Sequence, residues 1–86
     1  MTTKPPSPSQ ESPADSLERI AYSSVAAIPT EEPNDRNRLG YHVWRWLTSR
    51  EGTLEDAISE SGSRIQISHK EALKIVRGEL EKRGIR

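Results

Sequence analysis

The residues that begin and end helices constrain this fold most, because they divide the chain into helical segments of predictable length. Ser68-His69-Lys70-Glu71 is the clearest helix start. It matches the pattern in which a Ser hydroxyl and a Glu carboxylate, three residues apart, each accept a hydrogen bond from the other residue's backbone N–H. We predict a helix from this point to about Arg83, ended by Gly84.

Similar signals predict three earlier helices. Ser12-Pro13 offers a hydroxyl cap followed by proline at the first helical position, and Pro29 stops the run that follows. A second helix is expected from about Asp35 to Arg50, with Gly52 as its terminator. Thr53 opens a third helix of about two turns, which Gly62 closes. Between Gly62 and Ser68 the alternating residues 64–67 indicate a short strand-like link.

Apolar residues recur with helical spacing in these segments. Leu39, Val43, Trp46 and Leu47 lie in one sector of the second helix, and Leu73, Val76 and Leu80 lie in one sector of the last. We expect these two sectors to pack on each other. Trp46 should then be buried, and Trp44, on another side of the same helix, should be more exposed.

Two glycines stand inside predicted helices, at Gly40 and Gly78. A mid-helix glycine costs about 1 kcal/mol relative to alanine, so we expect each to mark a close approach between helices, inside one chain or between two copies.

Length and composition allow one small domain. The chain has 86 residues, of which 31% are hydrophobic and none is cysteine. We predict an all-α domain of three to four helices over residues 13–86, preceded by a disordered tail over residues 1–12 that is rich in Pro, Ser and Thr. The absence of cysteine favours a reducing compartment. With no secretory signal and no run of eighteen apolar residues, the expected location is the cytoplasm, without a membrane anchor.

The sequence offers little for catalysis. The two histidines, His42 and His69, each lie beside a helical apolar stripe, where a structural role is the more common one. Two histidines without cysteine make a poor metal site. The acidic pairs 31–32 and 55–56 fall in a connection and in a helix's first turn, where they complement the helix dipole. We therefore expect no enzyme activity, no metal and no cofactor.

Charge is distributed unevenly although the net charge is zero. Residues 63–86 carry seven basic and three acidic side chains, whereas residues 1–35 carry two basic and six acidic ones. Lys70, Lys74 and Arg77 fall at helical spacing along one side of the last helix, with Arg64 as an extension. Such a strip can meet a row of phosphates. The alternative is an ordinary solvated helix face, since Glu71, Glu79 and Glu81 share the helix.

Residues 38–86 resemble a winged-helix or helix-turn-helix DNA-binding domain. The similarity rests on a Trp-containing helix, a short capped helix and a longer basic helix that ends in Leu80-Glu81-Lys82-Arg83-Gly84-Ile85. The link over residues 62–68 is longer than the usual turn, and the chain given ends where a wing would begin. The resemblance implies a small DNA-binding regulator without a full wing, whose helix 69–83 enters the major groove. It also implies a homodimer, for which the first helix is a candidate contact.

A second hypothesis belongs to another functional class. Tyr41 and Trp44 point away from the apolar sector of their helix, so they either pack against the first helix or face a partner. Tyr and Trp are favoured anchors of protein interfaces. The chain is then an adaptor or inhibitor that binds a protein through Tyr41 and Trp44, or through its acidic N-terminal side.

Overall fold

Four α-helices make up the part of the chain that the computed structural model describes, residues 13–85. They are α1 (Pro13–Val25), α2 (Pro33–Ser49), α3 (Leu54–Glu60) and α4 (His69–Lys82). Within residues 13–85 the strand-like structure is limited to an isolated antiparallel bridge between Thr30 and Ile65. The all-α prediction is therefore confirmed. The disordered tail expected over residues 1–12 lies outside the described residues.

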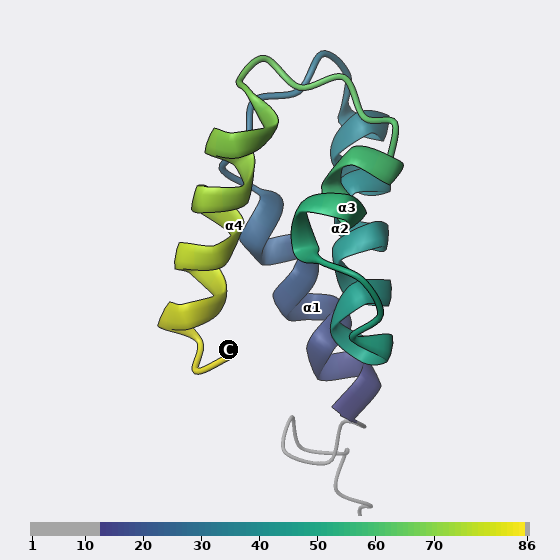
Figure 1. Ribbon diagram of the computed structural model, residues 1–86, viewed down its shortest axis with the longest axis vertical. Helices are drawn as coiled ribbons and strands as arrows, with labels where there is room; N and C mark the ends of the chain where they lie inside the picture. The colour runs from purple at the N-terminus through teal and green to yellow at the C-terminus, as the bar shows by residue number, and fades with distance from the viewer. Residues whose placement is uncertain (1–12, 86) are drawn as a thin grey trace, which may run out of the picture.

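The chain reverses direction at each connection (Figure 1). As a result, the α1–α2 and α3–α4 connections lie together at one end of the molecule, and the start of α1, the α2–α3 turn and the end of α4 lie at the other. Backbone hydrogen bonds join the first two connections: Glu31 N–H donates to the Arg64 carbonyl at 3.0 Å, and Gln66 N–H donates to the Pro29 carbonyl at 2.9 Å. The link at Ile65 is thus strand-like, as its alternation predicted.

The predicted helix starts hold for α3 and α4. The Thr53 hydroxyl accepts a hydrogen bond from the Asp56 N–H at 3.1 Å, and the Ser68 hydroxyl accepts one from the Glu71 N–H at 3.1 Å. Each bond satisfies a backbone donor that has no partner within the helix.

Helix α2 differs from its predicted bounds at both ends. It begins at Pro33 because Glu32 and Asp35 form a reciprocal capping box and proline suits the first helical position. It ends at Ser49 because Arg50 adopts the left-handed conformation, with φ of 56°, and donates its N–H to the Trp46 carbonyl. Gly52, the expected terminator, lies in the following turn with φ of 71°.

The hydrophobic core takes side chains from every helix. Its buried members are Ala21, Val25, Ile28, Leu39, Val43, Leu47, Leu54, Ile58, Ala72, Val76 and Leu80. Helix α1 ends at Val25, whereas the sequence predicted that it would continue to Pro29. Ile28, which follows the helix, is still buried in the core.

The apolar sectors of α2 and α4 share one core, but the two helices are not neighbours. No Cα atom of α2 lies within 8 Å of a Cα atom of α4, whereas α1 and α3 each pack against both. Leu39 and Leu80 therefore belong to one core without their helices being neighbours. The apolar stripe of a helix shows which side is buried, but it does not specify which helix covers it.

The two interior glycines behave differently. At Gly40 the ring of Tyr22 from α1 occupies the space that a Cβ atom would need, with Cε1 only 2.7 Å from its ideal position. The expected close approach is confirmed there. At Gly78, the described residues place no side chain and no backbone of another element within 4 Å of that position, so a close approach inside one chain is not found there.

Trp46 is not fully buried, as the sequence had predicted it to be. Both Trp44 and Trp46 are partly buried and pack at the edge of the core. Trp46 lies near the end of α2, and its indole N–H donates to the Gly52 carbonyl at 3.2 Å. This places one side of the ring at the surface.

Candidate binding surfaces

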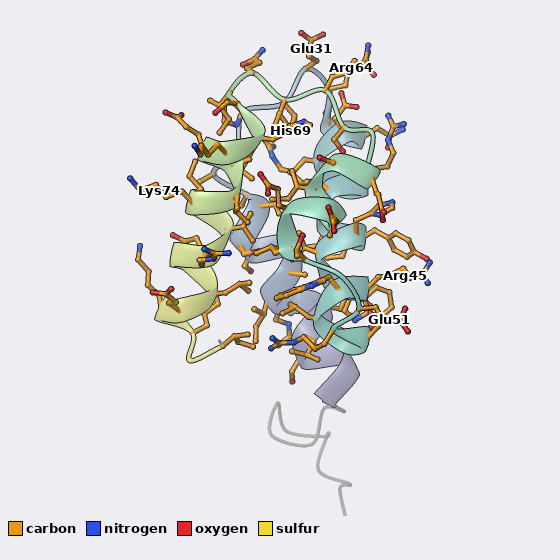
Figure 2. All side chains as sticks on the ribbon, viewed as in Figure 1. Glu31, Arg45, Glu51, Arg64, His69 and Lys74 are labelled. Atoms are coloured by element: carbon orange, nitrogen blue, oxygen red, sulfur yellow. The ribbon has the colours of Figure 1, made fainter. Side chains whose placement is uncertain are left out.

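The three basic residues predicted on the last helix form one exposed row, here called the α4 strip: Lys70, Lys74 and Arg77. They line shallow depressions along α4 together with Leu73, Gly78 and Glu81. Lys74 points away from the bundle (Figure 2). Within the described residues no carboxylate lies within 4.0 Å of these three cations, so their charges are available to a partner.

Arg64 is not part of this row. Its guanidinium lies 3.3 Å from the Glu32 carboxylate and 3.4 Å from the Asp35 carboxylate. Figure 2 shows Arg64 beside Glu31 at the end of the molecule where two loops meet, away from Lys74. The structure therefore separates Arg64 from the α4 strip, with which the sequence grouped it, and gives it a role in joining loops.

Carboxylates lie near the α4 strip as well. Glu71 and Glu81 are exposed on α4 itself, and α3 exposes Glu55, Asp56 and Glu60. In the helix-turn-helix arrangement implied by resemblance, α3 is the supporting helix and approaches the DNA backbone. Three carboxylates on that helix oppose the approach of phosphates.

A second candidate surface lies on the outer face of α2. The Tyr41 ring makes edge contacts with the rings of His42 and Trp44, with ring centroids 5.7 Å and 5.9 Å apart. The Arg45 guanidinium lies 5.9 Å from the centroid of the Tyr41 ring. We call these four residues the α2 aromatic cluster. Tyr41 is 42% exposed and is the large hydrophobic side chain left exposed among the described residues. Tyr22 of α1 lies over Gly40. Burial, Glu18 and then Tyr41 raise the pKa of Tyr22, so Tyr41 lies near α1 while its own ring stays partly exposed.

The α2 aromatic cluster lies on a basic face. The exposed residues of α2 include Arg38 and Arg45 and no carboxylate, since Asp35 is buried. Arg45 points away from the bundle in Figure 2. Aromatic rings and arginine, presented together on a rigid helix, have the composition of interface hot spots.

A third feature, which the sequence did not predict, is a groove of about 770 Å³ at the end of the molecule where α1 begins. We call it the Trp46 groove. It is lined by Trp46, Gly52, Thr53, Leu54, Arg77, Leu80, Glu81 and Ile85. Its residues come from α2, the α2–α3 turn, α3 and the end of α4, so only the tertiary structure brings them together.

Local hydrogen bonds shape the Trp46 groove. Beyond α4, Gly84 has φ of 80°, its N–H donates to the Glu81 carbonyl at 3.0 Å, and the Ile85 N–H donates to the Leu80 carbonyl at 2.9 Å. This is the Schellman ending, which folds the residue after glycine back over the last turn. Ile85 thereby lies beside Leu80. On the other side the Arg50 guanidinium stacks 4.8 Å from the Trp46 centroid.

The carboxylate of Asp35 is buried and surrounded by charged and polar partners. Burial disfavours its ionised form, but hydrogen bonds from the Arg64 and Glu32 backbone and the charges of Arg64 and Arg38 outweigh burial and lower its pKa. Arg38 lies 3.0 Å from it. Through these partners, Asp35 ties the α1–α2 connection and the α3–α4 connection to the start of α2. We therefore assign it a role in the fold. The sequence signal for this role of Asp35 is Glu32-x-x-Asp35, a capping-box pattern. It begins in the stretch that the sequence analysis treats as a connection.

The histidines are placed apart. The Nδ1 atom of His69 lies 3.3 Å from the exposed Ser59 hydroxyl, and His42 lies in the α2 aromatic cluster. Among the described residues, no group of three or more His, Cys, Asp or Glu side chains could hold a metal ion.

Over the same residues, the length and hydropathy of the helices fall short of what crossing a membrane requires. Comparison of the chain with protein-family models, curated proteins and solved structures finds no match.

Proposed function

We propose that this protein is a protein-binding adaptor that docks an acidic segment of its partner on the α2 aromatic cluster. The observation that carries the proposal is Tyr41, an exposed aromatic side chain held by edge contacts to His42 and Trp44 and covered on one face by Arg45. A ring fixed in this way loses little conformational entropy on binding.

The chemistry of the partner follows from the charge of the face. Arg38 and Arg45 flank Tyr41 without an exposed carboxylate on α2. Complementary charge favours a partner segment rich in Asp and Glu, with apolar side chains to cover the Tyr41 ring.

A titration with a defined probe tests this proposal. The probe is a synthetic peptide that alternates Glu or Asp with Leu and Tyr, added to the ¹⁵N-labelled full chain at low salt. Amide resonances of residues 38–48 should shift, and Tyr41→Ala should weaken binding more than about tenfold, since truncating a hot-spot aromatic costs about 2 kcal/mol or more. Gln66→Ala, an exposed change in the α3–α4 connection outside α2, is the control and should leave the affinity unchanged.

The second candidate function is duplex DNA binding by α4. It is favoured by the α4 strip, whose three cations have no carboxylate within ion-pair distance in the described chain. The same sample distinguishes the two functions. A random duplex at 50 mM salt that shifts resonances of residues 70–78, while the acidic peptide shifts none, would establish DNA binding and overturn the adaptor proposal.

A further inference from the structure

The Trp46 groove combines an apolar floor with charged sides. Leu54, Leu80 and Ile85 supply aliphatic surface next to the indole of Trp46, and Arg77 and Glu81 add one positive and one negative charge. Its volume of about 770 Å³ falls in the range of sites that enclose a ligand or a short peptide segment.

Two neighbours along the chain, Arg50 and Gly52, hold the orientation of Trp46. Its indole N–H already donates to the Gly52 carbonyl, and Arg50 stacks near its ring. The ring is therefore pre-set as a flat apolar wall. A tryptophan face presented in a groove is a surface on which a proline-rich segment packs, because the polyproline II conformation is extended and proline loses little entropy when it binds.

The sequence itself contains such a segment close by. Residues 5–8 read Pro-Pro-Ser-Pro, and they precede Pro13, the first residue of α1, by a short connection. Helix α1 begins at the end of the molecule where α2 and α4 end (Figure 1). At about 3.4 Å per residue, a fully extended chain can reach at most about 17 Å from Pro13 to Pro8 and about 27 Å from Pro13 to Pro5. That reach is comparable with the dimensions of a small domain.

The charges are also complementary. Lys4 precedes the prolines and Glu11 follows them, and the groove carries Glu81 and Arg77 on its sides. We infer that the Trp46 groove binds the chain's own segment Pro5–Pro8. This inference goes beyond the proposed function, because the groove shares no residue with the α2 aromatic cluster.

A paramagnetic label tests the inference in the full-length chain. Because the chain has no cysteine, Ser7→Cys gives one attachment site for a nitroxide. The label should strongly broaden the indole N–H of Trp46 and the amides of Leu54 and Ile85, and it should spare Ile65 at the opposite end. The same label in a chain in which Pro5, Pro6 and Pro8 are changed to Ser is the matched control, and there the broadening of the groove should be largely lost.

Two further measurements complete the test. Ile85→Glu places a charge in the groove beyond the end of α4, so it should release the label without unfolding the domain. Two results would overturn the inference. One is broadening confined to the first turn of α1, and the other is broadening of the groove that is equally strong with the prolines and with their serine replacements. A mixture of labelled ¹⁴N chain and unlabelled ¹⁵N chain identifies binding between two copies: if broadening of the groove appears there at equal strength, the intramolecular site is ruled out. None of these readouts needs a partner, so their failure is distinct from failure of the adaptor proposal.

Discussion

The Nε atom of Arg64 lies 3.4 Å from the Oδ2 atom of Asp35, a carboxylate with no exposed surface. This contact joins the α3–α4 connection to the first turn of α2. The Ser63 hydroxyl adds a hydrogen bond to the Asp35 carbonyl at 2.6 Å, and the Arg36 guanidinium donates to the Ile28 carbonyl at 3.0 Å. Polar contacts thus join the two connections at this end of the bundle.

Removing the charge of Asp35 should destabilise the fold. In Asp35→Asn the side chain keeps its shape, but Arg64 and Arg38 lose their ionic partner and the capping box with Glu32 is weakened. We expect a lower denaturation midpoint in urea with an unchanged slope. Glu32→Gln, which changes an exposed carboxylate in the same network, is the control. It should lower the free energy of unfolding clearly less than Asp35→Asn does. Equal losses in the two variants would contradict a special role for the buried group.

Stability should fall in acid because of the same residue. The pKa of Asp35 is lower in the folded chain than its ordinary value of 3.8, so the unfolded chain takes up its proton first as pH falls. The contribution of Asp35 is therefore fully present above the unfolded pKa and is lost as pH falls through the folded one. Urea unfolding gives the free energy of unfolding of the native chain and of Asp35→Asn. The difference between the two values should be smaller at pH 3 than at pH 7. A constant gap would contradict the assignment.

The two mid-helix glycines should respond to alanine with opposite signs. At Gly40 the new methyl group meets the Tyr22 ring, so Gly40→Ala should destabilise by about 1–3 kcal/mol through overpacking. At Gly78 the position is open, so Gly78→Ala should stabilise by up to about 1 kcal/mol through helix propensity. Thermal unfolding of both variants checks the pair, and the Tyr22→Ala background should remove the penalty at Gly40.

Salt dependence decides the DNA-binding candidate. If Lys70, Lys74 and Arg77 each neutralise one phosphate, log affinity should fall with log salt at a slope of about −2.7, since each phosphate contributes about −0.9. Replacing Lys74 and Arg77 with Glu should flatten the slope by about two units for every duplex sequence. Lys82→Glu is the control, because Lys82 pairs with Glu79 outside the strip. No binding at 50 mM salt would rule out this function.

The sequence by itself determined the helices and most of their ends. Caps such as Thr53 and Ser68 act within one turn of the backbone, so their pattern can be read locally. The side of each helix that is buried was also readable, as at Val43 and Val76, because helical periodicity separates apolar from polar faces.

Only the tertiary structure decided which elements meet. An apolar stripe fits any other apolar stripe, so the placement of α1 and α3 between α2 and α4 has no local signal. The pairing of Arg64 with Asp35 removed one residue from the expected basic strip, and the folding back of Ile85 over Leu80 created a groove from residues distant in sequence. Such contacts depend on loop closure and on the summed packing of all four helices, which no short stretch of the chain encodes.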